Sequence, residues 1–430
     1  MVEVHGARST ATLDSGRRLT VLQGGIVAGR DDYNVLTLNA DTVVEVNSGG
    51  AVTAGARFDE VNGTPVAVQT GVGADAFLNS PHELFIGGTV TTSDEMRLGS
   101  GSPLLSHDDY FSTIAVVDPD HPLVDHTRYG ILLTGTLTSL AANTELKLQS
   151  HSDVIVRGNI HVFGAGSDLL VQSDSFTYIE SFIDVRDNAK IFGGVSALGN
   201  VIAPPVAPSS GTGLRTDGSS VYVHTTSRIV TRNAGSRIDI KGAADVDLYG
   251  AVVAGGAIGE HGVEFSGPGS TINVTSGQQL LLDTGLLASG YVNVTSGAPG
   301  PDDTLSALFA GHALPAGTID DRLSLVVTTA GGISTSGETT NHSGGAITIN
   351  AAGNIEVLGN LTAGAKVTQQ FDFDGNFLGE LFDYTTDPAT LNITTTGRAF
   401  LGGHTFNEGG QIVQTGTYLR AAHAITVHGG

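Results

Sequence analysis

The sequence predicts an all-β protein that winds as a single-stranded, right-handed parallel β-helix with three short strands in each coil. Three observations support this prediction. A hydrophobic template recurs along the chain, copies of it lie in tandem at a fixed period, and the composition favours short strands joined by tight turns. Short strands repeated in one frame are typical of a solenoid, in which each coil packs only against its neighbours.

The template consists of three apolar pairs, and one residue separates the two members of each pair. A gap of five residues follows the first pair and a gap of three follows the second. Alternate residues share one face of a strand, so each pair predicts a short strand with its apolar side facing inward. The template fits Leu36, Leu38, Val44, Val46, Gly50 and Val52; Leu146, Leu148, Val154, Val156, Ile160 and Val162; Ile238, Ile240, Val246, Leu248, Val252 and Ala254; Ile272, Val274, Leu280, Leu282, Leu286 and Ala288; and Ile347, Ile349, Ile355, Val357, Leu361 and Ala363.

Tandem copies of the template give the length of one coil. Residues 146–168 align without a gap with residues 169–191, a period of 23, and residues 272–277 return as residues 292–297, a period of 20. These periods are too short for helical-hairpin repeats and lack the asparagine signature of leucine-rich repeats. Asn273 and Asn293 take the same outward position in the second tandem, so we expect them to stack in a side-chain ladder.

Composition agrees with this fold and excludes several functions. Glycine accounts for 60 of 430 residues, about twice its usual share. The net charge of −23 argues against nucleic-acid binding, which needs clustered Lys and Arg. The absence of cysteine excludes disulfides and thiolate metal sites, and no stretch reaches the roughly 18 apolar residues of a membrane span. Because a solenoid has no size limit, we expect one continuous domain over residues 1–430.

Four stretches break the template and are predicted to be insertions, near residues 98–130, 193–220, 298–322 and 365–389. The second follows the third-strand pair Ile183 and Val185, and the fourth follows Leu361. We therefore expect one edge of the coil, the turn after the third strand, to carry the loops and any binding surface that they form together.

The first insertion concentrates residue types that bind metals. Histidine with carboxylate suits zinc or manganese, and carboxylates alone suit calcium, although the spacing matches no defined site. The candidate ligands are His107, Asp108, Asp109, Asp118, Asp120, His121, Asp125 and His126.

The fourth insertion offers a second candidate metal site, with calcium as the cofactor. Asp372, Asp374, Asn376 and Glu380 supply oxygen ligands, but the glycine at 375 stands two places too early for an EF-hand. The flanking residues read as two strands, so a hairpin with its tip near Asp374 is the competing interpretation. Two further segments, Gly71–Phe77 and Gly164–Leu170, partly match a calcium-binding repeat. Each is a single copy, whereas the ion needs consecutive copies, so both are predicted to be turns.

An enzyme on this scaffold would resemble the pectin-degrading β-helices, which need Arg or Lys with calcium carboxylates, or several Asp residues with His, Arg and Lys. Here the acid pairs Asp31-Asp32, Asp108-Asp109, Asp302-Asp303 and Asp320-Asp321 are isolated in turns or loops. Tryptophan is absent and other aromatics are few, which leaves little for a sugar-stacking cleft. We therefore expect no enzyme, with a polysaccharide lyase or hydrolase as the alternative.

The segment Gly345–Gly364 resembles the repeats of filamentous-haemagglutinin-like bacterial surface proteins, and the resemblance extends over most regular coils. It implies a right-handed β-helix that serves as an exported adhesive shaft or fibre at the cell surface. The asparagine-proline motifs of that family's secretion domain have no match here, and no functional residue of the family maps onto this chain.

The expected function is thus an extracellular structural or adhesive β-helix of a bacterial surface protein. Its expected partners are a host or neighbour-cell glycan or protein. The similar strands at residues 2–6 and 424–430 suggest self-association end to end, or packing against neighbouring repeats of the same polypeptide.

The calcium alternative makes a direct prediction about stability. If calcium binds the native chain, adding a chelator lowers the melting temperature, because a ligand of the folded state raises its apparent stability. Thermal unfolding followed by circular dichroism, with and without chelator, measures this, and an unchanged melting temperature rules the calcium-stabilised module out.

Overall fold

The computed structural model describes the chain except for residues 1, 62–63, 101–128, 197–218, 260–261, 300–321, 329, 336–344, 372–376, 385–387, 403–404, 409–410 and 415–418. Every regular element in the described part is a β-strand. None of the described residues forms a helix of the length and apolarity needed to cross a bilayer. Contacts group the chain into two compact units, Met1–Ser227 and Arg228–Gly430.

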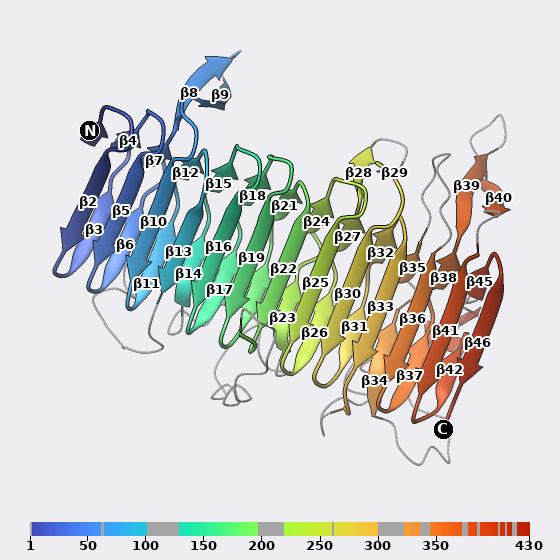
Figure 1. Cartoon of the computed structure of the whole chain (residues 1–430). Helices are drawn as coiled ribbons and strands as arrows, with labels where there is room; N and C mark the ends of the chain where they lie inside the picture. Colours follow the sequence, from blue (N-terminus) through green and yellow to red (C-terminus); the bar gives the residue numbers. More distant parts are fainter. Residues whose placement is uncertain are drawn as a thin grey trace. The chain divides into compact units, whose positions relative to one another are not determined.

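In the first unit, the chain runs in turn through three parallel sheets, which we name B, C and A in the order of the repeat (Figure 1). Sheet B contains β2 (Thr10–Ser15), β5 (Val35–Ala40), β10 (Asp75–Ser80), β13 (Met96–Ser100), β16 (Glu145–Ser150), β19 (Asp168–Ser173) and β22 (Asn188–Gly193). Sheet C contains β3 (Arg18–Val21), β6 (Val43–Val46), β11 (Glu83–Ile86), β14 (Tyr129–Leu133), β17 (Asp153–Val156), β20 (Thr177–Ile179) and β23 (Ser219–Val223). Sheet A contains β1 (Val2–Val4), β4 (Ile26–Gly29), β7 (Ala51–Ala54), β12 (Thr89–Thr92), β15 (Thr136–Ser139), β18 (Asn159–Val162) and β21 (Phe182–Val185).

The second unit repeats the same order of sheets. Sheet B contains β25 (Arg237–Gly242), β30 (Thr271–Ser276), β33 (Tyr291–Ser296), β36 (Ala346–Ala351), β41 (Thr390–Thr395) and β46 (Ala424–His428). Sheet C contains β26 (Asp245–Leu248), β31 (Leu280–Leu282), β34 (Leu323–Val327), β37 (Asn354–Val357) and β42 (Ala399–Leu401). Sheet A contains β24 (Arg228–Thr231), β27 (Ala251–Ala254), β32 (Gly285–Ala288), β35 (Gly332–Ser334), β38 (Asn360–Ala363) and β45 (Leu419–Ala421). The predicted all-β parallel β-helix is thus confirmed in each unit.

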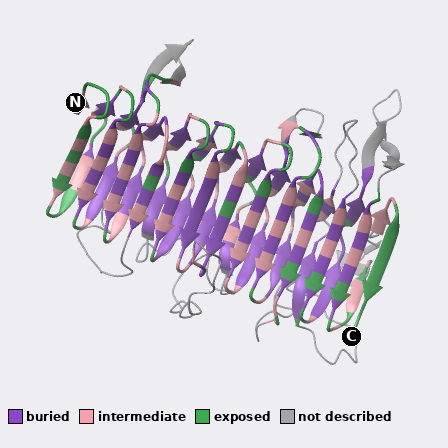
Figure 2. Ribbon diagram, viewed as in Figure 1, coloured by how far each residue is buried: buried purple, intermediate pink, exposed green. Residues whose placement is uncertain are grey.

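The inward positions of the template form the core. In the coil of residues 146–162, for example, the inward side chains are at most 1% exposed, and buried and less buried residues alternate along its sheet B strand, β16 (Figure 2). Both predicted periods are confirmed by the strand register: Leu146 pairs with Leu169, and Ile272 pairs with Val292. The ladder is confirmed as well, since Asn293 Nδ2 donates to Asn273 Oδ1 at 2.9 Å.

One of the five coils that were fitted to the template departs from it. Val52 pairs with Val90, and this row continues through Leu137 to Ile160, so Val52 takes the fifth inward position rather than the sixth. The prediction that Gly50 fills that position was wrong, because the preceding turn is two residues longer in this coil. Gly49 in that turn has a φ of 76°, a conformation that glycine adopts without strain.

Antiparallel hairpins interrupt the coils at several places. Three of them follow a strand of sheet A: β8–β9 (Ala56–Val61 and Thr64–Gln69), β28–β29 (Gly256–Gly259 and Gly262–Phe265) and β39–β40 (Ala365–Phe371 and Phe377–Tyr384). A fourth, β43–β44 (Thr405–Glu408 and Gln411–Gln414), lies between a strand of sheet C and one of sheet A. The hairpin interpretation of residues 365–389 is therefore confirmed.

Each of the three hairpins after sheet A leaves the coil at an Ala-Gly step. Gly55, Gly255 and Gly364 have φ of 62°, 80° and 66°, which disfavours any other residue. At Gly55, moreover, a Cβ would collide with Ser93 Oγ of the next coil. The Gly55 N–H donates to Gly29 O at 2.6 Å, and the Thr70 N–H donates to Gly55 O at 2.8 Å. Backbone hydrogen bonds therefore close the base of the hairpin.

The prediction that the turn after the third strand carries the loops holds for residues 365–389, which follow β38 of sheet A, but was wrong for the other three stretches. Residues 101–128, 197–218 and 300–321 follow the sheet B strands β13, β22 and β33, and lie outside the described residues. The stretch near 193–220 does not follow Ile183 and Val185 directly. Strand β22 of sheet B lies between that pair and the stretch. The sequence signal of that strand is weak, since one of its inward residues is only Ala189.

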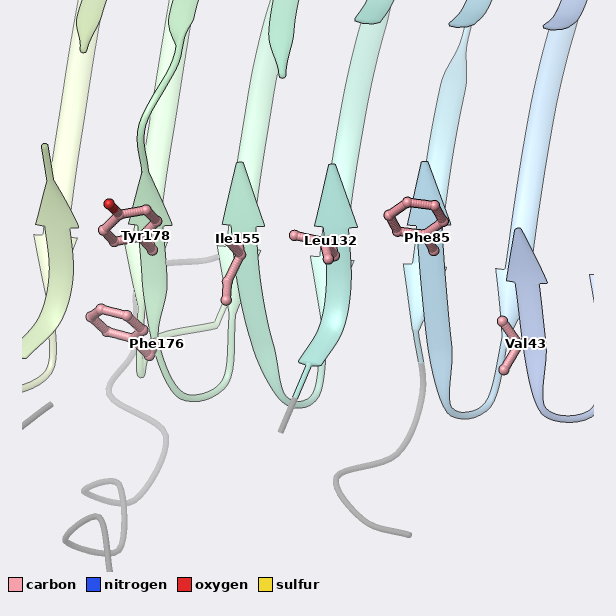
Figure 3. Packing of buried hydrophobic residues seen from close by; sticks show 6 residues of the cluster. All are labelled: Val43, Phe85, Leu132, Ile155, Phe176 and Tyr178. Carbon is pink, nitrogen blue, oxygen red and sulfur yellow. The ribbon is translucent and has the colours of Figure 1, made fainter. Parts of the chain in front are cut away.

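Sheet C of the first unit is buried on its outer face as well. Phe85, Leu132, Ile155 and Tyr178 take the same outward position on neighbouring strands and are 2–5% exposed (Figure 3). With Val43 and Phe176 they form one apolar cluster. The template assumes that only one face of each strand is buried, so it did not predict this second layer.

The outer layer should contribute to stability as a core does. Leu132→Ala removes a side chain that is 2% exposed and should lower the free energy of unfolding by about 2–5 kcal/mol. Leu22→Ala, at a residue 64% exposed, is the matched control and should change it by less than about 0.5 kcal/mol. Chemical denaturation followed by circular dichroism measures both, and equal effects would show that the outer row is not tightly packed.

Candidate functional site

The outward face of sheet B in the first unit carries an ordered row of polar side chains. Strand register places Asp14, Asn39, Asn79, Gly99, Gln149 and Gln172 at the same outward position on consecutive strands. All follow directly after an inward apolar residue, so the alternation of the strand turns them to the surface. Neighbouring positions in such a row are about 4.8 Å apart, close enough for side chains to bond.

Hydrogen bonds join this row on both sides of one gap. Asn39 Nδ2 donates to Asp14 Oδ1 at 2.7 Å, and Asn79 Nδ2 donates to Asn39 Oδ1 at 3.1 Å. Beyond the gap, Gln149 Nε2 lies 3.4 Å from Gln172 Oε1. Gly99 lies between the two groups and has no side chain, so the ladder stops at Asn79 and starts again at Gln149.

A hollow of about 510 Å³ opens over this gap. Its lining combines the amide row with serines at the ends of the strands and with residues of the turn toward sheet C. The lining residues are Asn39, Ala40, Asp41, Asn79, Ser80, Pro81, Gly99, Ser100, Gln149, Ser150, His151 and Gln172. We call this hollow the amide groove.

A second hollow of about 260 Å³ shares Gln149 with the amide groove and extends over β16, β19 and β22. It is lined by Glu145, Lys147, Gln149, Asp168, Leu169, Leu170, Asn188 and Lys190. Polar surface therefore continues along sheet B over several coils of the first unit.

The cations beside the amide groove are neutralised by carboxylates on the same sheet. Arg97 Nη2 lies 2.8 Å from Glu95 Oε1, and Lys147 Nζ lies 2.6 Å from Glu145 Oε2. At the turn, His151 Nδ1 lies 2.5 Å from Asp174 Oδ2. The groove thus presents mainly neutral amides. The hydroxyls of Ser80, Ser100 and Ser150 are buried and hydrogen-bonded, and Asp41 is the exposed carboxylate of the lining.

Asp75 is the first residue of β10, the strand that carries Asn79, and its pKa is shifted. Burial, together with the nearby carboxylates of Asp94 and Glu95, raises the pKa of Asp75 to about 6. A hydrogen bond from the Glu95 N–H to Asp75 Oδ1, 3.1 Å long, opposes this shift. Asp75 therefore titrates above the usual range of an aspartate.

A second polar cluster lies at the end of three sheet C strands. The Tyr178 hydroxyl donates to Glu180 Oε2 at 3.1 Å, and Arg157 Nε lies 3.2 Å from the same oxygen. His224 Nδ1 is 3.9 Å from Glu180 Oε1. Burial and the adjacent Glu180 carboxylate raise the pKa of Tyr178 far above its ordinary value, so the phenol stays protonated and acts as a donor. The cluster joins turns of consecutive coils, and its groups are already used in bonding to one another.

The structure describes little of the predicted metal sites. His107, Asp108, Asp109, Asp118, Asp120, His121, Asp125 and His126 lie outside the described residues, as do Asp372, Asp374 and Asn376. Glu380 lies in β40, where its backbone pairs with Gln369. Among the residues that are described, no three His, Asp or Glu side chains gather as metal ligands would.

The two isolated echoes of a calcium-binding repeat are turns, as predicted. Gly73 and Gly166 have φ of 63° and 74° and stand two residues before the first residues of β10 and β19. Asp75 and Asp168, which would have been ligands, are the first residues of those strands.

The amide groove was not predicted, although a signal for it exists in the sequence. A polar residue follows the second inward residue of the first strand in coil after coil, as Asn39, Asn79, Gln149 and Gln172. The same reasoning that predicted stacking of Asn273 and Asn293 would have predicted this row, and Gly99 would have marked its gap.

Comparison with known proteins leaves the family open. No protein-family model matches the chain, and neither a curated protein nor a solved structure does. The resemblance to filamentous-haemagglutinin-like proteins therefore stays a prediction from sequence.

The shifted Asp75 makes a prediction about pH. A raised pKa means that the folded state binds the Asp75 proton more tightly than the unfolded state does. The stability of the folded protein therefore falls as pH rises from about 4 to about 6. Asp75→Asn keeps the acceptor for the Glu95 N–H and should raise the melting temperature at pH 7, with little change at pH 4.

Melting temperatures between pH 4 and pH 7 measure this effect, with Asp41→Asn, at an exposed aspartate, as the control. The charged groups that face Asp75 are Asp94, Glu95 and, through its pair with Glu95, Arg97. Parallel pH profiles for the wild type and Asp75→Asn would contradict the assignment.

Proposed function

We propose that the chain is a non-enzymatic, extracellular adhesive β-helix of a bacterial surface protein, and that its first unit binds a target through the amide groove. The observation that carries this proposal is the groove itself. Amide groups are displayed at fixed spacing on a regular parallel sheet, and hydrogen bonds along the row already order these side chains, which lowers the entropy cost of binding.

Binding accounts for the chemistry of the groove better than catalysis does. Cleavage of a glycan by acid and base needs two titratable groups that face each other across the bond. Of the lining residues, only Asp41 and His151 carry a carboxylate or an imidazole, and His151 is already paired with Asp174. The resemblance of Gly345–Gly364 to adhesin repeats supports the same choice.

Self-association along the solenoid belongs to the same proposal. All residues of β46 are exposed, and its inward-type residues Ile425 and Val427 are 45% and 39% exposed (Figure 2). An open strand edge with apolar side chains favours pairing with another strand. That strand would come from a second copy or from neighbouring repeats of the same polypeptide.

Adhesion can be tested with groove variants of the full chain. We expect the labelled protein to bind bacterial or host cells, and we expect the double substitution Asn79→Ala and Gln149→Ala to weaken this binding by about tenfold, because each lost hydrogen bond contributes about 0.5–1.5 kcal/mol. Flow cytometry over a range of protein concentrations measures the affinity.

The matched control is the double substitution Asn273→Ala and Asn293→Ala, which removes an equivalent ladder from the second unit. Equal losses in both double variants, or no binding by the wild type, would contradict the proposal. Release of reducing ends or unsaturated products from polysaccharides would replace adhesion with catalysis.

A further inference from the structure

The gap in the amide row leaves hydrogen-bonding groups without a partner from the sheet. Asn79 uses its Nδ2 to reach Asn39, so its Oδ1 is turned toward Gly99, where a Cβ added to the glycine would lie 3.4 Å from it. Among the described residues no donor reaches this oxygen. On the other side, Gln149 directs its Nε2 away from the gap, toward Gln172.

The chemistry of the gap is that of an uncharged ligand rich in hydroxyl groups. Amide oxygens accept hydrogen bonds and amide nitrogens donate them, so a row of amides matches sugar hydroxyls, which do both. Arg97 and Lys147 are paired with Glu95 and Glu145, which disfavours an anionic ligand. The net charge of −23 also disfavours a polyanion.

The geometry of the row also indicates how a bound chain would lie on the sheet. Asn79 and Gln149 lie two strands apart, about 10 Å, which leaves room for one ring between their side chains. The polar row runs across the strands, so an extended chain that follows it would meet the amides of Asn39, Asn79, Gln149 and Gln172 in turn, with the gap at Gly99 between the second and the third. The second hollow continues from Gln149 in the same direction.

From these observations we infer that the amide groove binds an extended neutral polysaccharide, which lies across the strands of sheet B with one sugar ring over Gly99. This inference rests on the proposed function and names its ligand. Gly99 acts as the specificity-determining residue, because it opens the space that an amide would otherwise fill.

Gly99→Gln is the informative substitution. Gly99 is the fourth of the five residues of β13 and does not have a positive φ, and in the described part of the chain only Asn79 Oδ1 lies close to an added Cβ. A glutamine fits the strand, donates to Asn79 Oδ1 and completes the ladder. It should leave the fold intact and block the groove. Gly99→Ala adds only the Cβ, and Thr348→Gln places the same new amide on sheet B of the second unit as the control.

Titration calorimetry of the full chain with neutral oligosaccharides, such as glucan, mannan and xylan fragments, tests the inference beside a matched series of uronate oligomers. We expect a neutral oligosaccharide to bind with an affinity that changes little between low and high salt. Gly99→Gln should weaken binding by roughly tenfold or more. Gly99→Ala should change it by less, and Thr348→Gln should not change it. Circular dichroism confirms that each variant is folded.

Three results would overturn the inference: binding by uronates alone, a steep loss of affinity with salt, or equal affinity in wild type and Gly99→Gln. Competition with cell adhesion separates the two proposals. If cells bind through the groove and no neutral oligosaccharide competes, the glycan inference fails alone. If neutral oligosaccharides bind but no cell surface does, the adhesive function fails and the glycan site stands.

Discussion

In-register parallel stacking of neighbouring coils is the constraint on which the other features of each unit depend. Inward residues lie over their counterparts in the next coil, as Val90, Leu137 and Ile160 do in sheet A of the first unit, and each is fully buried. A slip of one residue would turn every inward side chain to the surface, so the register is strongly specified. The same register aligns the outward side chains. An asparagine that recurs becomes a hydrogen-bonded ladder, and a glycine at that position becomes a gap.

Much of this arrangement could be predicted from periodicity, because the inward positions are apolar and evenly spaced. The limits of prediction lie where small residues weaken the pattern. In the coil of Val46, both Gly50 and Ala54 are small, so the pattern does not show whether Val52 is the sixth inward residue or the fifth, and it fits two turn lengths equally well. The register of Val52 with Val90 settles the choice only in three dimensions. Ala189 weakened the signal of β22 in the same way.

The outer layer of sheet C and the amide groove were missed for a different reason. Leu84-Phe85-Ile86 and Val154-Ile155-Val156 are continuous apolar runs, which are typical of strands buried on both faces. Their alternate residues also satisfy a one-sided template, so that template hid the second layer. The groove depends on side chains that come from strands 20 to 50 residues apart, such as Asn79, Gly99 and Gln149. Its gap is the absence of a side chain, which no search for reactive residues detects.

The Ala-Gly corners after sheet A separate the solenoid from the segments that leave it. At Gly55 the chain bonds to the coil before it, leaves as β8–β9, and bonds back to the same glycine at Thr70. Gly255 does likewise, since its N–H reaches Thr231 O and its O accepts from Ser266 N–H. The entry and exit points of these two hairpins are therefore fixed by the corner and not by the hairpin itself. Segments of different length and sequence can occupy such a corner without a change in register, so the surface of the protein can diversify while its coils stay constant.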